Sequence, residues 1–197
     1  MSRRKEASPT RRTLRVAGLF AGIGGIESGL HAAGHETSLL CELDPWALEV
    51  LGRKFPDCRK HPDITTLDAL PEVDLVAAGF PCQDVSLARM GPREGLHGSQ
   101  SGLFFKFAEL VGDRLPRVVV LENVGGLLSS NNGRDFAVVA RTLADLGYCV
   151  AWRMLDSRHF GVPQSRTRLF LVGSLGEEAT AGQILLEPEC GQGNPET

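Results

Sequence analysis

Cys82 is the residue whose type and setting best suit a nucleophile, and it stands within residues 79–86, GFPCQDVS. The rigid Pro81 precedes it at the end of an apolar run. The thiol is therefore expected at the edge of a sheet, where open α/β proteins place their clefts. A thiolate is intrinsically nucleophilic and needs only a modest lowering of its pKa to attack carbon. A buried structural thiol is the alternative for a cysteine taken alone, and the neighbouring motifs weigh against it.

An acid and an amide, Glu122 and Asn123, end the most apolar run of the chain, residues 117–124 (RVVVLENV). Polar groups at a buried strand end are costly unless they bond to something. A carboxyl group in such a place can be held protonated and can donate a proton. A structural or helix-capping carboxylate remains the alternative for this motif alone.

Two arginines, Arg166 and Arg168, lie in the segment QSRTR just before another apolar run. In an extended segment, residues two apart point to the same side. Two neighbouring guanidinium groups suit a phosphate or a carboxylate. A solvated or ion-paired strand edge is the alternative.

A glycine-rich loop, residues 20–25 (FAGIGG), connects an expected strand to an expected helix. Glycines let the backbone turn sharply and let a ligand approach, and a helix N-terminus adds free N–H donors. Glu42 follows Gly22 by the spacing at which an acid holds a ribose. The loop and the acid together favour a nucleotide-like cofactor but do not separate NAD from S-adenosylmethionine. A tight turn without a ligand remains possible for the loop alone.

Strands and helices must alternate to position these motifs, which predicts a doubly wound, mostly parallel α/β sheet. The expected strands are residues 14–19, 36–41, 73–79, 117–124, 148–155 and 168–173. The expected helices are residues 26–33, 45–55, 103–115 and 135–146. Residues 1–12 are interpreted as a basic disordered tail, 13–175 as one domain, and 176–197 as a second tail with little periodicity.

Charge and composition narrow the function classes. Residues 1–15 hold six basic side chains and one acid, a formal charge of +5. Because the whole chain has a formal net charge of −3, residues 16–197 carry −8. Contacts to phosphate are therefore expected from locally placed arginines rather than from a broad basic surface. No apolar run is long enough to span a membrane. The paired arginines at positions 11 and 12 are not followed by the kind of apolar segment and cleavage site that a leader peptide has. The cysteines show no CxxC spacing, so neither zinc nor a disulfide framework is predicted; they are Cys41, Cys58, Cys82, Cys149 and Cys190.

These motifs, in this order, resemble the cytosine-5 DNA methyltransferase family over residues 14–173. FAGIGG is similar to its cofactor loop, PCQ to its catalytic loop, ENV to its acid motif and QSRTR to its arginine motif. HPDITTL, residues 61–67, resembles the segment that contacts adenine. The resemblance implies a Rossmann-like fold of the S-adenosylmethionine-dependent methyltransferase type, with double-stranded DNA as the partner.

The resemblance also implies a role for each matching residue. Cys82 would attack C6 of a cytosine flipped out of the duplex, and Glu122 would protonate N3. Arg166 and Arg168 would steady the base and its phosphate, with Asn123 supporting the site. No metal is implied. The implied S-adenosylmethionine contacts are Phe20, Ala21, Gly22, Ile23, Gly24, Gly25, Glu42, Leu43, Asp63, Ile64, Pro81 and Leu103.

Family members continue into a target-recognition region, of which residues 176–197 would be only the start. A fragment, or a subunit completed by a second polypeptide, is therefore expected. Its expected setting is the bacterial or phage-type cytoplasm, associated with the nucleoid. A non-catalytic S-adenosylmethionine-binding subunit is the alternative function. An NAD-dependent dehydrogenase is disfavoured because position 27 lacks the third glycine of its fingerprint.

Overall fold

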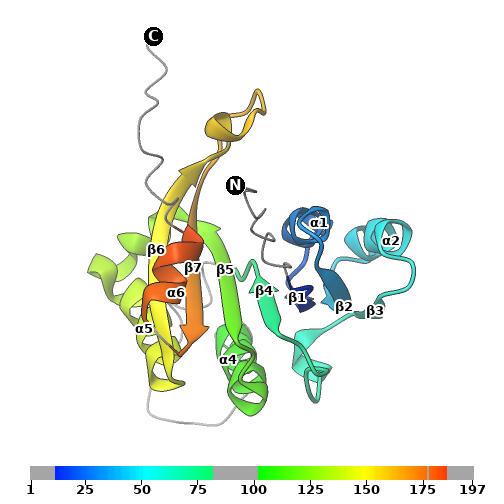
Figure 1. The fold of residues 1–197 in the computed structure, drawn as a ribbon, viewed down its shortest axis with the longest axis horizontal. Coiled ribbons are helices and arrows are strands. Elements are labelled where there is room, and N and C mark those ends of the chain that lie inside the picture. The colour runs from blue at the N-terminus through cyan, green and yellow to red at the C-terminus, as the bar shows by residue number, and fades with distance from the viewer. Residues whose placement is uncertain (1–11, 82–101, 177, 186–197) are drawn as a thin grey trace, which may run out of the picture.

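A computed structural model of the chain describes residues 12–81, 102–176 and 178–185, and these form one mixed sheet with helices packed on it (Figure 1). The strand order within these residues is β3-β2-β1-β4-β5-β7-β6. β1 to β5 pair in parallel, whereas β7 runs antiparallel to both β5 and β6. The strands are β1 (Arg15–Leu19), β2 (Glu36–Cys41), β3 (Arg59–His61), β4 (Leu75–Ala78), β5 (Val118–Val124), β6 (Tyr148–Asp156) and β7 (Thr167–Leu175). The predicted doubly wound, mostly parallel α/β fold is thus confirmed.

Helices cover both faces of this sheet. α1 (Gly25–Ala32) and α2 (Pro45–Lys54) pack on one face, and α4 (Gly102–Arg114) and α5 (Arg134–Asp145) pack on the other. The larger core lies on the second face, where the α4 rings Phe104 and Phe107 are fully buried. β4 is buried at all four residues, as expected for a parallel strand covered on both sides.

The strand order reverses between β1 and β4, because β1 leads outward to β2 while the chain later returns to β4 on its other side. In open α/β sheets this switch point opens a crevice at the carboxyl ends of the strands, and ligands bind there. The glycine-rich loop follows β1 and the segment 79–81 follows β4, so both border this crevice.

Two elements were not predicted from the sequence. β3 is a three-residue, polar edge strand (RKH), which carries no hydrophobic alternation. α6 (Glu178–Leu185) packs against β6 and β7 and buries Ala181, within the stretch interpreted from the sequence as a tail with little periodicity. Its eight residues are too few for a clear helical periodicity.

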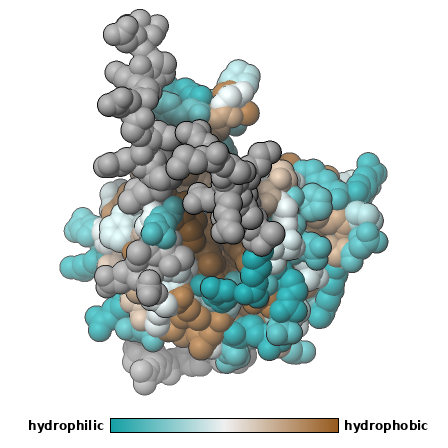
Figure 2. Space-filling view, viewed as in Figure 1, coloured by the Kyte–Doolittle hydropathy of each residue, from teal (hydrophilic) through white to brown (hydrophobic). Residues whose placement is uncertain are grey.

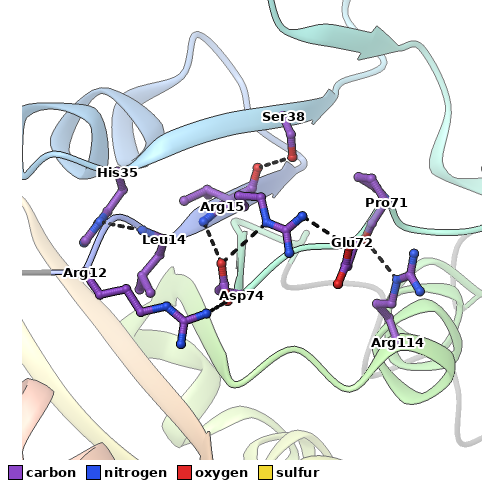
Figure 3. Close-up of polar contacts among 10 residues, drawn as sticks. Arg12, Leu14, Arg15, His35, Ser38, Pro71, Glu72, Asp74 and Arg114 are labelled. Atoms are coloured by element: carbon purple, nitrogen blue, oxygen red, sulfur yellow. Dashed lines mark hydrogen bonds and ion pairs between the residues drawn. The ribbon is translucent and has the colours of Figure 1, made fainter.

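The amino ends of β1 and β4 are joined by a polar cluster around Asp74 (Figure 3). Its carboxylate accepts a hydrogen bond from the Arg15 backbone amide at 3.0 Å and from Arg12 Nη2 at 3.1 Å. Arg15 also reaches Glu72 at 3.3 Å. This cluster lies at the opposite end of β1 from the glycine-rich loop, so it fixes the sheet and not the crevice.

The β6–β7 hairpin extends well beyond the rest of the sheet, and the short helix η4 (Ser157–Phe160) lies at its tip (Figure 1). Two hydrogen bonds of 3.1 Å hold the tip: the Ser157 amide donates to the Arg166 carbonyl, and the Arg166 amide donates to Ser157 Oγ. The hairpin thereby carries side chains from its tip back toward the crevice. No helix in the described ranges combines the length and apolar character needed to cross a bilayer.

Candidate functional site

The glycine-rich loop between β1 and α1 adopts a backbone that only small residues tolerate well. Gly22 and Gly24 have φ angles of 53° and 78°, in the left-handed region. A Cβ atom on Gly24 would lie 2.8 Å from atoms of both Leu51 and Phe55 on α2. Glycine at position 24 therefore lets the loop pack directly on α2, and this packing aims the N-terminus of α1 at the crevice.

Glu42 binds this loop through its carboxylate. One oxygen, Oε2, accepts a hydrogen bond from the Gly22 amide at 2.7 Å, and Oε1 accepts one from the Asp44 amide at 2.9 Å. Asp44 in turn caps α2, because its side chain accepts from the Trp46 amide at 2.8 Å. The acid predicted to hold a ribose thus lies beside the predicted cofactor loop, at the carboxyl end of β2.

The three other residues expected near adenine have different surroundings. Leu43 is 72% exposed beside Glu42. The Asp63 carboxylate accepts from the Thr65 amide at 2.8 Å and caps the short helix η1 (Ile64–Thr66). The Ile64 side chain is buried in the main core, so only its backbone is placed to meet a ligand.

Glu122 and Arg168 form an ion pair across the β5–β7 pairing. Arg168 Nε lies 3.0 Å from Glu122 Oε1, and each side chain is 23% exposed. The second carboxylate oxygen, Oε2, faces Gly79, where an added Cβ atom would lie 3.5 Å from it. The acid at the end of β5 is therefore held on one oxygen and directed toward the segment that follows β4.

Asn123 ties β5 to the segment that follows β4 from within the protein. It is buried, its Nδ2 donates to the Phe80 carbonyl at 2.9 Å, and its Oδ1 accepts from the Val124 amide at 2.8 Å. Phe80 stands two residues before Cys82, which lies outside the described residues. Asn123 thus fixes the backbone from which the chain continues to the predicted nucleophile.

Pro81 and Leu103 occupy the two ends of the segment that the structure leaves undescribed, residues 82–101. Pro81 is exposed after the end of β4. Leu103 is half-buried and packs against the main core from the first turn of α4. Neither side chain lines the cavity described next.

A cavity of about 610 Å³ joins the two halves of the site. The glycine-rich loop borders this cavity, and so do Glu122, Arg166 and Arg168. Figure 2 shows apolar surface in the hollow at the centre of the view. Its lining residues are Phe20, Ala21, Gly22, Ile23, Gly25, Ile26, Gly79, Glu122, Leu155, Ser157, Phe160, Arg166, Arg168 and Phe170.

Six of these lining residues were not singled out from the sequence: Ile26, Gly79, Leu155, Ser157, Phe160 and Phe170. Phe170 continues the two-residue alternation of Arg166 and Arg168, and this signal could have found it. Gly79 directly precedes the FPC segment. Phe160 lines the cavity from η4 at the tip of the hairpin, and no local pattern in the sequence shows this placement.

Two buried cysteines among the described residues, Cys41 and Cys58, are poorly suited to attack carbon. Burial, reinforced by the negative charges of Asp63 and Glu42, raises the pKa of Cys41 to about 12. Burial also raises the pKa of Cys58. A thiol with a raised pKa supplies little thiolate at neutral pH. Among the residues that the structure describes, no three or more His, Cys, Asp or Glu side chains are grouped so that they could hold a metal ion.

Comparison with known proteins identifies the family to which the chain is similar. Residues 14–191 match the family model described as C-5 cytosine-specific DNA methylase. The type II methyltransferase M2.BsuMI of Bacillus subtilis is 46% identical over 169 residues, which cover 84% of this chain and 43% of that protein. M.HhaI of Haemophilus parahaemolyticus is 35% identical, over 81% of this chain and 48% of its own length.

A solved structure, the Dnmt2 methyltransferase of S. pombe, superimposes with a TM-score of 0.67 at 26% identity. The match covers 83% of this chain and 52% of that one. The chain therefore spans about half the length of the relatives that it matches.

Proposed function

The chain belongs to the C-5 cytosine-specific DNA methylase family, and we propose that it forms the catalytic part of an enzyme that methylates C5 of cytosine in DNA. One observation carries this proposal. The glycine-rich loop and the Glu122–Arg168 pair, which come from distant parts of the chain, border the same cavity. A methyl transfer needs its donor and its acceptor side by side, and the residues proposed for the two line one cavity.

The residues around the glycine-rich loop fit S-adenosylmethionine. Gly22, with its positive φ and with nothing within 4 Å of an added Cβ, leaves open space for close approach. Glu42 lies at the carboxyl end of β2 and faces this loop, where it would meet ribose hydroxyls. Leu43 offers an exposed apolar surface to adenine. When bound, the cofactor supplies the methyl group as an electrophile.

The chain's own residues would also hold and activate cytosine. Arg166 and Arg168 offer guanidinium donors to the base and its phosphate. Glu122 presents its Oε2 toward the segment after β4, where it would meet N3 of the base. Asn123 would act by positioning, because it holds the Phe80 carbonyl and so the backbone leading to Cys82.

The chemistry begins when the Cys82 thiolate forms a bond to C6 of cytosine. The C5–C6 double bond opens, and a proton from Glu122 to N3 neutralises the charge that the addition would leave. C5 then carries enamine electron density and takes the methyl group. A water molecule takes the C5 proton, the C5–C6 double bond re-forms as the thiolate leaves C6, and N3 returns its proton to Glu122. The thiol cannot reach C6 inside a duplex, so the base must be flipped out.

The remaining parts of such an enzyme would choose the DNA sequence. We propose that they are supplied either by further polypeptide or by a separate subunit, since the relatives are about twice as long as the matched region. We place the boundary of the catalytic domain near residue 175, after β7. The cytoplasm, beside the chromosome, is the setting that this substrate and a free-thiol nucleophile require.

Radiolabelled methyl transfer to mixed-sequence DNA, with wild-type protein and a Cys82→Ser variant, tests the proposal. Label in 5-methylcytosine with the wild type and none with the variant is the expected result when target recognition is also present. A completed enzyme that transfers label equally well with C82S would overturn the mechanism. Failure to bind S-adenosylmethionine in a titration would overturn the cofactor assignment independently of any DNA.

A further inference from the structure

We propose that Phe160 is the aromatic wall of the target-base subsite, against which the ring of the flipped cytosine stacks. This inference deepens the proposed function and rests on it. Phe160 belongs to η4 at the tip of the β6–β7 hairpin, and it lines the same cavity as Glu122, Arg166 and Arg168. The cavity thus has an aromatic side chain and hydrogen-bonding side chains among its lining residues, as recognition of a flat heterocycle requires.

The exposure of Phe160 indicates that the fold does not use its ring. The side chain is 60% exposed, whereas the other two rings that line the cavity, Phe20 and Phe170, are half-buried. A large apolar side chain left in water gives up most of the free energy that its burial would contribute. A base stacked on the ring would recover part of it, and every base has a face that suits such stacking.

The position of Phe160 is fixed relative to the polar side of the cavity. Ser157, the first residue of η4, exchanges two hydrogen bonds with Arg166, both at 3.1 Å. Gly161, with a φ of 77°, turns the chain directly after the ring. Phe160 and Arg166 are therefore carried by one tied loop, and both side chains line the same cavity.

Charge favours a nucleotide as the occupant of this subsite. Residues 148–175 contain four arginines and one aspartate, a formal charge of +3 in a chain whose total is −3. The hairpin is thus the locally basic part of an acidic body, and a phosphate backbone is attracted to it. Figure 2 shows apolar surface beside polar surface at the hairpin tip, at the top of the view.

The test compares wild type, Phe160→Ala, Phe160→Tyr and Val162→Ala in the full chain. Val162 is the matched control, because it is also exposed on the hairpin but does not line the cavity. The probe is a single-stranded oligonucleotide with one pyrrolocytosine, a cytosine analogue whose fluorescence reports stacking, added with S-adenosylhomocysteine. A second readout, taken with S-adenosylmethionine in place of S-adenosylhomocysteine, is the rate of the covalent adduct formed with 5-fluorocytosine in the same sequence.

We expect F160A to weaken probe binding at least fivefold, roughly the loss of one base–aromatic stack, while F160Y and V162A stay within about twofold. Adduct formation should fall in parallel at subsaturating oligonucleotide. Affinity for S-adenosylhomocysteine and the melting temperature should be unchanged in every variant. Rescue by tyrosine, which keeps the ring, separates stacking from a general loss of structure.

Three results would overturn the assignment: equal binding by F160A and wild type, equal losses in F160A and V162A, or a loss of cofactor affinity in F160A. Failure of the proposed function gives a different result from failure of the Phe160 assignment. When the function fails, the wild type itself shows neither probe binding nor adduct. In that case the assignment of Phe160 falls with the function on which it rests.

Discussion

The Glu27 carboxylate lies so close to Gly18 that a Cβ atom on that glycine would stand 2.2 Å from Glu27 Oε1. Glu27 is in the first turn of α1 and only 1% exposed, and its Oε2 has no hydrogen-bond partner within the described part of the chain. The absence of a side chain on β1 therefore makes room for a buried acid beneath the cofactor loop. An uncompensated carboxylate in such a place is costly, so burial raises the pKa of Glu27 to about 7.

This buried acid predicts that stability falls as pH rises from about 4.5, its ordinary pKa, to about 7. The raised pKa means that the folded state binds more protons than the unfolded state across this window. The negative charge of Glu42 raises the pKa of Glu27 further, and the positive charge of Lys54 lowers it. The unfolding free energy should drop by on the order of 3 kcal/mol through this group. Urea denaturation at pH 5, 6, 7 and 8 measures it.

Glu27→Gln should flatten this part of the pH profile, because the amide mimics the protonated acid and cannot ionise. The variant should be more stable than wild type at pH 8. Glu49→Gln, on the exposed side of α2, serves as the control and should leave the profile unchanged. An unaltered slope in E27Q would show that some other group is responsible.

Asp74 should contribute to stability without affecting the crevice. Asp74→Ala leaves the Arg15 amide without its acceptor and removes the Arg12 and Arg15 ion pairs (Figure 3). The expected loss is about 1–3 kcal/mol of unfolding free energy. Glu72→Ala removes only a solvent-exposed pair and should cost less than about 1 kcal/mol. Chemical denaturation compares the two, and similar losses would assign no special role to Asp74.

The order of the main elements followed from the sequence because each carries a strong local signal. β5 is a run of β-branched residues, and Asp44 and Pro45 begin α2 as a cap and a first helical residue. β3 and α6 had no such signal, since one is polar and the other is short. Their existence depends on pairing and packing with distant strands, which a local pattern does not record.

The candidate site was predictable as a set of strand ends, but its geometry was not. Glu42 and Gly22 were expected to serve one ligand, and they are hydrogen-bonded to each other. The ion pair between Glu122 and Arg168 depends on β7 running antiparallel beside β5, and the motifs alone did not reveal this. Ile64 was expected at the cofactor, yet its side chain belongs to the core.

Glu42→Ala should weaken S-adenosylmethionine binding at least tenfold. The substitution removes the carboxylate expected at the ribose and also frees the Gly22 amide that it holds at 2.7 Å. Hydrogen bonds to a charged group contribute roughly 1.5–3 kcal/mol each, which corresponds to this loss. Isothermal titration gives the affinity. Glu36→Ala, at the other end of β2, is the matched control, and an equal effect there would refute a local role.

Glu122→Gln should reduce methyl transfer by roughly 10²–10⁴-fold, the range for a lost general acid. The amide keeps the shape and can still meet Arg168, but it cannot give up a proton in the same way. Cofactor affinity should be unchanged, because the residues proposed to hold the cofactor are in the glycine-rich loop and directly after β2. Single-turnover kinetics on a completed enzyme separates these effects. Activity within about threefold of wild type would exclude Glu122 as the acid.

Asn123 should affect the rate through position rather than through contact with the base. Its buried amide links β5 to the Phe80 carbonyl at 2.9 Å, two residues before Cys82. Asn123→Ala leaves that carbonyl and the Val124 amide without their partners, which should cost about 1–3 kcal/mol of stability. Asn123→Asp keeps the acceptor for the Val124 amide but removes the donor to Phe80.

A positioning role predicts that both Asn123 variants slow the adduct between Cys82 and 5-fluorocytosine at saturating oligonucleotide, while S-adenosylmethionine affinity stays near that of wild type. The variants should also share one deficit, because both lose the Nδ2 donor to Phe80. A purely structural role would instead lower stability without slowing the adduct in the fraction that remains folded. Measuring both quantities at a temperature well below the melting transition distinguishes the two.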